Sequence, residues 1–214
     1  MKKGFTLAEV LITLGIVAAV AILTIPATVK NYRYKVYSAS LKKTYSQIQD
    51  AVNNIMADEM TSEFWKTSAS DTTSGGAGGK YFLTNYFKYT RICDQNNRKN
   101  CIGDKYKASD GTLQNTYGHN CIITINGAGI CYWNHPTGGS SAILIDVNGP
   151  AEPNMVGVDG FVAVIDRNTG EVKDWLSDPA RCNVKGTGGN NHIGDYAAGC
   201  LAKAMQNDWV ITED

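Results

Sequence analysis

A single carboxylate, Glu9, lies inside the apolar stretch that runs from Phe5 to Pro26 near the start of this 214-residue chain. A carboxylate at the centre of an apolar layer costs roughly 2.5 to 3.5 kcal/mol on insertion scales, so its presence there indicates a function. If the chain were cut between Gly4 and Phe5, the new amino terminus would carry a positive charge one helical turn from Glu9. Glu9 of one copy would then pair with the terminal amine of the next copy, which offsets the cost of burying both charges.

The residues around this carboxylate form a known kind of motif. The sequence GFTLAEVL, which begins at Gly4, closely resembles the prepilin cleavage and methylation motif of type IV pilins and type II secretion pseudopilins. The resemblance implies that a prepilin peptidase cuts between Gly4 and Phe5 and methylates the new amino terminus at Phe5. It also implies that Glu9 is the assembly carboxylate and that Pro26 bends the helix. The resemblance covers about the first 30 residues and ends near Lys30.

Two other interpretations of the same stretch stay open. A secretory signal peptide also combines a basic start with an apolar core, and Ala19-Val20-Ala21 offers a small-residue cleavage site. A plain membrane anchor is the other, since the run from Phe5 to Pro26 reaches the length of about 20 apolar residues that a membrane-spanning helix needs. Neither of these requires a glutamate inside the apolar run.

The cysteines indicate covalent cross-links. Six cysteines, an even number, are typical of disulfides in an exported protein. Zinc is not favoured, because the sequence contains no C-x-x-C spacing. The sequence alone does not choose among the possible pairings, and joining sequence neighbours is the simplest arrangement: Cys93–Cys101, Cys121–Cys131 and Cys182–Cys200.

One glycine-rich segment carries oxygen side chains that suit a hard cation. Asp146, Asn148 and Asp159 are candidate calcium ligands, although their spacing is not that of an EF-hand. Some type II secretion pseudopilins hold calcium in a loop of the head, so the resemblance adds support. The alternative is that these side chains only make Asx turns. No other cofactor is expected.

The sequence does not favour an enzyme or a nucleic-acid-binding protein. The three histidines lie near glycine or asparagine without a recognisable motif partner, and neither G-x-S-x-G nor H-E-x-x-H occurs. The run GGAGGK that ends at Lys80 lacks the spacing of a phosphate-binding loop. The 20 basic and 20 acidic residues balance, so no strongly basic surface is expected. No catalytic residue is therefore nominated.

Hydrophobic periodicity predicts one long helix. Apolar residues recur at steps of three and four, which indicates a helical stripe. The simplest interpretation is a helix from Thr6 to about Asp58, bent at Pro26, with a flexible linker over 61–80. The stripe consists of Tyr37, Leu41, Tyr45, Ile48, Val52, Ile55 and Met56.

The remainder of the chain predicts strands. Short β-branched runs separated by glycine-rich turns favour an antiparallel sheet of about four or five strands. The stretch from Tyr81 to Ile92 is ambiguous between helix and sheet edge, and 94–118 reads as a loop tied by cysteines. A short helix is expected over 195–206. The predicted strands are 121–125, 129–133, 142–147, 160–165 and 171–175.

Together these patterns predict an α+β fold: a long N-terminal α-helix, membrane-spanning in its first half, packed against a small antiparallel β-sheet head, which the resemblance makes pilin-like. The expected parts are a leader, an apolar helix for membrane and assembly, its amphipathic continuation, a linker and a disulfide-containing head. Their bounds are 1–4, 5–29, 30–60, 61–80 and 81–214.

The resemblance implies a structural subunit of a type IV pilus or a type II secretion pseudopilus. Its expected partners are further copies of itself, a prepilin peptidase, an inner-membrane assembly platform and the membrane, with no nucleic acid. The expected location is the bacterial inner membrane before assembly, and the periplasm or cell surface in the filament. The alternative is a membrane-anchored binding or adhesin head that does not polymerise.

Overall fold

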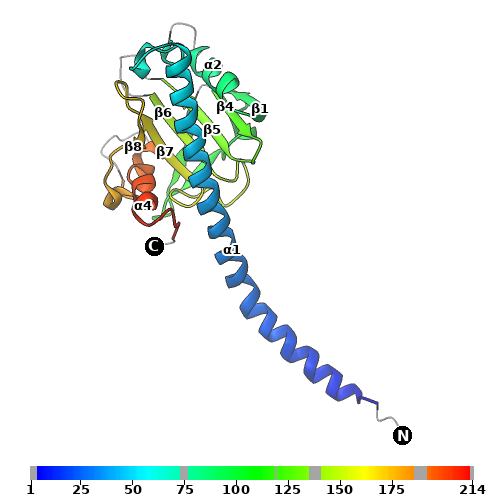
Figure 1. Cartoon of the computed structure of the whole chain (residues 1–214). Helices are drawn as coiled ribbons and strands as arrows, with labels where there is room; N and C mark the ends of the chain where they lie inside the picture. The colour runs from blue at the N-terminus through cyan, green and yellow to red at the C-terminus, as the bar shows by residue number, and fades with distance from the viewer. Residues whose placement is uncertain (1–3, 73–76, 119, 135–140, 186–191, 213–214) are drawn as a thin grey trace.

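A single helix, α1, joins the two parts of the molecule. The structure is a computed structural model that describes residues 4–72, 77–118, 120–134, 141–185 and 192–212. Helix α1 spans Leu7–Asp58 and contains Pro26. Its C-terminal half lies along the head, and its N-terminal half projects away from it (Figure 1). The two halves therefore have different surroundings.

The expected membrane span is not found. None of the helices in the described ranges is long and apolar enough to cross a membrane. The expected fold class, a helix with a membrane-spanning first half on a small sheet, is therefore wrong. That expectation rested on the length of the apolar run, which Glu9, Thr13 and Thr24 interrupt with polar side chains.

The C-terminal half of α1 supplies one wall of the core. Leu41, Ile48, Val52 and Ile55 are fully buried, and Tyr37 is nearly so. Tyr45 and Met56 pack against the same core while partly exposed. The predicted helical stripe is therefore confirmed, and it marks the face by which α1 contacts the head.

The head contains a six-stranded antiparallel sheet with the order β1-β4-β5-β6-β7-β8. Every residue of β6 and β7 is buried, so the centre of the sheet is covered on both faces. A separate antiparallel pair, β2 and β3, completes the strands of the described chain. The bounds are β1 Tyr89–Asp94, β2 Lys105–Lys107, β3 Leu113–Asn115, β4 Asn120–Thr124, β5 Gly129–Trp133, β6 Ser141–Asp146, β7 Gly160–Ile165 and β8 Val172–Asp174.

The sheet is larger than the four or five strands expected. All five predicted strands are present as β4 to β8. Strand β1 comes from the stretch whose sequence is ambiguous, and β2 and β3 lie where a loop is expected. These three strands expose most of their side chains, with a single buried position each, so they lack a continuous apolar signal.

Short helices and turns cover the ends of the sheet. Within the expected linker of residues 61–80, Phe64–Lys66 and Ser68–Ser70 form single 3-10 turns, in which Phe64 and Ala69 are fully buried. The short helix expected over 195–206 is split at Gly199, whose φ of 90° is left-handed. The elements are η1 Phe64–Lys66, η2 Ser68–Ser70, α2 Ala77–Tyr86, η3 Arg98–Asn100, η4 Pro179–Arg181, α3 Ile193–Ala197 and α4 Cys200–Gln206.

Three disulfides join neighbours in the sequence, which confirms the disulfide prediction. Cys121–Cys131 links the paired strands β4 and β5 at directly opposed positions. Cys93–Cys101 ties β1 to the turn that follows it, and Cys182–Cys200 ties η4 to α4. Each bridge therefore stabilises local structure of the head rather than linking the head to α1.

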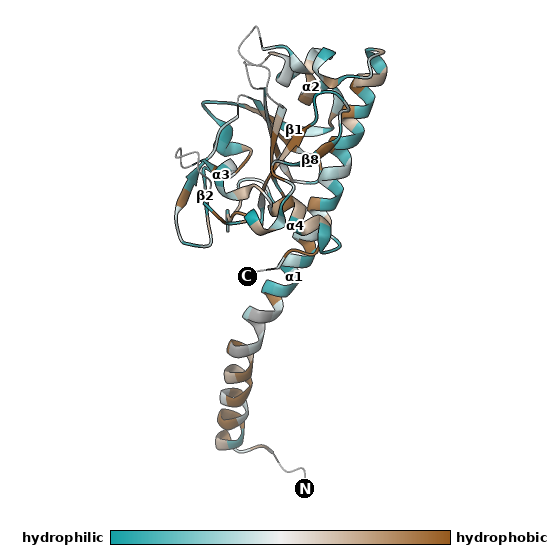
Figure 2. Ribbon diagram, turned by 90° about the vertical axis from the view of Figure 1, so that its left-hand side faces the viewer, coloured by the Kyte–Doolittle hydropathy of each residue, from teal (hydrophilic) through white to brown (hydrophobic). Residues whose placement is uncertain are grey.

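Hydrophobic residues occur in both the head and the projecting half of α1. In Figure 2 the strands inside the head are brown, and so is much of the projecting half of α1. The strands are covered by other elements, whereas the projecting half of α1 stands alone in this chain.

Packing of α1 on the head can be tested with two matched valines. Val52→Ala should lower the free energy of unfolding by about 2 kcal/mol, since Val52 is fully buried. Val36→Ala on the same helix should change it by less than about 0.5 kcal/mol, because Val36 is 45% exposed. Urea denaturation followed by tryptophan fluorescence measures both. Equal losses for the two variants would contradict the docking face assigned to α1.

Candidate functional site

The candidate site is the projecting segment, defined as Gly4 to Val29. Its described large apolar side chains are all strongly exposed, from 43% for Val10 to 89% for Phe5. They lie at consecutive positions such as Val10, Leu11 and Ile12, and therefore surround the helix rather than form one stripe. The exposed set is Phe5, Leu7, Val10, Leu11, Ile12, Leu14, Ile16, Val17, Val20, Ile22 and Val29.

Glu9 caps the start of its own helix. Its Oε2 accepts hydrogen bonds from the Thr6 backbone N–H and the Thr6 hydroxyl, each at 2.8 Å. The Thr6 Oγ1 in turn accepts from the Glu9 N–H at 3.3 Å, which completes a capping box. The backbone hydrogen bond from Thr6, followed by that from its hydroxyl, lowers the pKa of Glu9. The carboxylate is therefore ionised at neutral pH and directed at the first turn of α1.

The predicted processing site lies just before this cap. Gly4 and Phe5 are exposed and precede the first residue of α1, and Thr6 has an extended backbone with φ −78° and ψ 153°. The Gly4–Phe5 bond is thus outside the helix and open to a protease. Cleavage and methylation there stay predictions.

Pro26 does not end α1. The helix continues through it to Asp58, although proline has no N–H to donate within the helix. Thr24 and Thr28, on either side, donate their hydroxyls to the carbonyls of Val20 and Thr24 at 2.9 and 3.0 Å. Pro26 leaves the carbonyl of Ile22, four residues earlier, without its usual N–H donor, and the two hydroxyl bonds go to other carbonyls of the helix. A bend centred on Pro26 stays a prediction.

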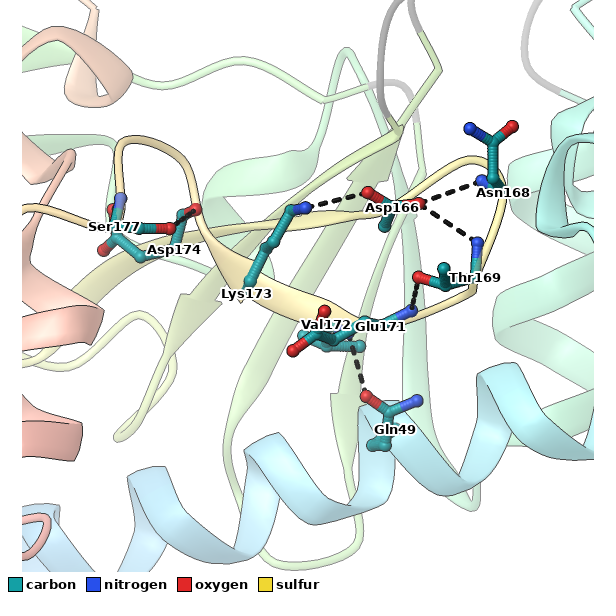
Figure 3. A network of polar contacts seen from close by, with 9 residues as sticks. All are labelled: Gln49, Asp166, Asn168, Thr169, Glu171, Val172, Lys173, Asp174 and Ser177. Atoms are coloured by element: carbon teal, nitrogen blue, oxygen red, sulfur yellow. Dashed lines mark hydrogen bonds and ion pairs between the residues drawn. The ribbon is translucent and has the colours of Figure 1, made fainter.

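The head is fixed to α1 by polar contacts at the edge of the sheet. Gln49 accepts a hydrogen bond from the Val172 N–H at 2.8 Å (Figure 3). The Gln49 amide also donates to the Gly170 carbonyl at 3.0 Å. The Tyr45 hydroxyl donates to the Val172 carbonyl at 2.8 Å. Strand β8 pairs with β7 on one side only, so these side chains satisfy its other edge. Sequence reasoning did not single out Gln49, because a polar residue beside an apolar stripe is ordinary.

The turn before β8 is held by one carboxylate. Asp166 accepts from the Asn168 and Thr169 N–H groups and from Lys173 Nζ, the last at 2.8 Å (Figure 3). The Lys173 ammonium, with the backbone bonds, lowers the pKa of Asp166 well below its usual range. The hairpin therefore presents its outer edge to α1 in a fixed position.

A buried carboxylate joins β8 to α4. Asp174 is 2% exposed. Its two oxygens accept from backbone N–H groups at the end of β8 and at the start of α4, and no charge pattern in the sequence marks this role. The donors are Leu176, Ser177, Gly199, Leu201 and Ala202.

The C-terminal segment contacts the same stretch of α1. The rings of Tyr45 and Trp209 lie 5.0 Å apart. The Ile211 N–H donates to Ser38 Oγ at 3.0 Å, and the Ile211 side chain is buried. The C-terminal half of α1 is therefore held by β8 and by the end of the chain.

The structure brings two of the candidate calcium ligands close enough to interact. Asp146 and Asp159 are both fully buried. Tyr106 donates its hydroxyl to Asp146 Oδ2, which also accepts from the Gly103 N–H at 2.9 Å. Burial raises the pKa of Asp146 well above its ordinary value, and the Asp159 carboxylate raises it further. Burial likewise raises the pKa of Asp159 to about 6.

The candidate ligands also form hydrogen bonds with the backbone of their own loop. Asp159 accepts the backbone N–H groups of Asn154 and Met155, and the Asn148 amide nitrogen donates to the Ala151 carbonyl at 2.7 Å. The amide oxygens of Asn148 and Asn154 are buried without a hydrogen-bond partner in the described chain. Among the described residues, no group of three or more His, Cys, Asp or Glu is placed to hold a metal. Calcium at this loop stays a prediction.

In the described chain, the His192 ring packs edge to face against the Tyr117 ring, with 4.7 Å between the ring centroids. His119 and His135 lie outside the described residues, and His192 precedes α3. Comparison with protein-family models, with curated proteins and with solved structures gives no match.

The buried Asp159 predicts a pH dependence of stability. Its pKa of about 6 in the folded chain exceeds the unfolded value near 4, so its contribution is complete below about pH 4 and is lost as the pH rises through 6. The loss is at most about 3 kcal/mol. Thermal unfolding between pH 4 and 7 should show the melting temperature of wild type falling relative to that of Asp159→Asn. The exposed Asp208→Asn should follow wild type, and a constant difference between wild type and Asp159→Asn would refute the assignment.

The calcium prediction has a separate test. A ligand that binds only the folded state raises its stability, by about 2.7 kcal/mol at a hundredfold excess over Kd. Calcium should therefore raise the melting temperature of the wild-type chain, and Asp146→Asn should remove the response that Asp208→Asn retains. An unchanged melting temperature in millimolar calcium would rule out calcium binding at this loop.

Proposed function

We propose that the chain is a structural subunit of a filament of the type IV pilus or type II secretion pseudopilus class, which polymerises through its projecting segment. The observation that carries the proposal is the exposed apolar surface around the whole circumference of that segment. The motif from Gly4 to Leu11 supports it independently. The head would face outward from the filament.

The apolar surface requires a cover that the head does not supply. A helix that is apolar all round belongs in the interior of a larger structure. Burying one Val, Leu or Ile side chain stabilises by about 1.5 to 3 kcal/mol. Because the surface is continuous around the helix, one neighbouring helix would cover only part of it. Several copies packed around each segment would cover all of it.

The charge of Glu9 must be neutralised for the segments to pack in this way. Its bonds to Thr6 satisfy part of the carboxylate within one chain. They do not neutralise its charge, which would be buried in the bundle. In the proposal, cleavage before Phe5 creates the amine that does so on a neighbouring copy. The pairing would also fix the stagger between copies.

The docked half of α1 makes the head a rigid attachment. Gln49 and Tyr45 form hydrogen bonds with the backbone of β8, and the apolar face of α1 from Leu41 to Ile55 packs in the core. A head held in this way would keep a constant orientation from copy to copy. In the proposal a prepilin peptidase and an assembly platform act on the chain, and the filament lies in the periplasm or at the cell surface.

The role of Glu9 can be tested by comparing two charge-removing variants. Glu9→Gln should reduce incorporation into filaments about tenfold or more, since leaving one member of a buried charge pair unpaired costs roughly 3 to 5 kcal/mol. Glu171→Gln makes the same change on the exposed surface of the head and should assemble normally. Shearing of cells followed by immunoblotting of the filament and cell fractions measures both.

Expression levels of the two variants must match for the comparison to count. Normal assembly of Glu9→Gln would overturn the proposed role of the carboxylate. Failure of wild type to enter any sheared fraction, with the chain intact in cells, would favour an anchored head that does not polymerise.

A further inference from the structure

Basic and acidic side chains occupy separate stretches of α1 and the turn after it. The stretch from Lys30 to Lys43 contains five basic residues and no acidic one. The next four charged residues, from Asp50 to Glu63, are all acidic. The docked half of α1, which forms one side of the head in Figure 2, therefore changes from positive to negative toward its C-terminal end.

Asp50 is the one carboxylate of this acidic stretch that has no partner in the described chain. It is exposed, and its carboxylate forms neither a hydrogen bond nor an ion pair with the described residues. The other three carboxylates are engaged within the chain: Asp58 by the Tyr86 hydroxyl, Glu59 by the Ser68 N–H and Glu63 by Lys66.

Lys42 and Lys43 are the basic residues nearest to Asp50 along α1. Both are exposed, and neither ammonium group forms an ion pair with a described residue. They precede Asp50 by eight and seven residues, which is about 12 and 10.5 Å along the helix axis. Side chains on one helix meet at spacings of three or four residues, so neither lysine pairs with Asp50 of its own chain.

The stagger between neighbouring copies would bring these groups to the same level. A terminal amine at Phe5 that pairs with Glu9 of a neighbour shifts the two copies by the distance between Phe5 and Glu9 along α1. This distance is roughly 6 Å if all these residues are helical, and roughly 10 Å if Phe5 and Thr6 are extended. The Thr6 backbone is extended, which favours the larger shift. A shift of about 10 Å matches the spacing between Lys43 and Asp50.

We propose that Asp50 of one copy forms ion pairs with Lys42 and Lys43 of the neighbouring copy whose terminal amine meets its Glu9. The inference rests on the proposed filament and adds a second contact to it, between the exposed faces of the docked halves of α1. Glu9 and Asp50 lie about 60 Å apart along the helix. Two charge pairs at this separation fix the stagger between copies at both ends of α1.

Charge reversal tests the pairing in assembled filaments. Asp50→Lys should lower the sheared filament fraction about threefold or more, because it places like charges opposite each other. The triple variant with Lys42→Glu, Lys43→Glu and Asp50→Lys restores opposite charges and should recover assembly. Immunoblotting of the sheared and cell fractions measures the variants, and circular dichroism confirms that each head is folded.

Lys88 supplies the matched control for these variants. It lines a cavity of about 170 Å³ together with Asp50, yet forms no ion pair with it in the described chain. Lys88→Gln should therefore assemble as wild type does. Normal assembly of Asp50→Lys, or no recovery in the triple variant, would overturn the pairing and leave the filament standing. A wild-type chain that enters no sheared fraction would overturn the filament and this contact together.

Cross-linking measures the stagger without relying on a charge change. All six native cysteines are in disulfides, so one introduced cysteine is the only free thiol of its chain. Cells that express Lys43→Cys and Asp50→Cys chains together should yield dimers when their filaments are treated with a short bismaleimide.

Two controls set the specificity of the cross-link. Lys43→Cys or Asp50→Cys expressed alone should give no dimer. Lys35→Cys with Asp50→Cys should also give none, because these positions are about 22 Å apart along the axis and stay apart after a shift of about 10 Å. Dimers from the Lys35 combination, or none from the Lys43 combination in filaments that do form, would contradict the proposed stagger.

Discussion

One helix meets two opposite requirements, and the rest of the structure depends on that contrast. The C-terminal half of α1 buries a single apolar face, from Leu41 to Ile55, against the sheet. The N-terminal half carries apolar side chains all round and has no such cover in the described chain. The hydrophobic effect acts on both halves alike, so the second half requires a partner outside its own head. In the proposed filament, further copies of the chain would cover this apolar surface.

Polar contacts join α1 to the edge of the sheet and to the C-terminal segment. Gln49 and Tyr45 satisfy the free edge of β8, and Asp166 fixes the preceding turn. Asp174 joins β8 to α4, after which Trp209 returns to α1. Asp174 is buried, and leaving a buried polar group without its hydrogen bonds costs about 1 to 3 kcal/mol.

The sequence predicted the parts of the fold that have a strong local signal. The strands β4 to β8 are short β-branched runs, and the stripe on α1 recurs with helical spacing. Neighbour pairing of the cysteines also agrees with the structure. The strands β1, β2 and β3 were missed because each buries one residue and reads as polar. Buried Phe64 shows why a polar, small-residue stretch need not be a linker.

At the candidate site, Glu9 could be identified from the sequence because it is a charged residue in an apolar run. Its hydrogen bonds to Thr6 could be identified only from the structure. Gln49 and Asp174 act through contacts between distant segments, which no local pattern records.

The proposal requires that the chain is cleaved before Phe5 and that the new terminal amine pairs with the Glu9 carboxylate of another copy. The most direct measurement is the mass of the N-terminal peptide of the chain recovered from cells with and without prepilin peptidase. The account predicts a chain that begins at N-methylated Phe5 when the peptidase is present, and an uncut chain when it is absent. A functional chain that still begins at Met1, or that begins after Ala21, would contradict it.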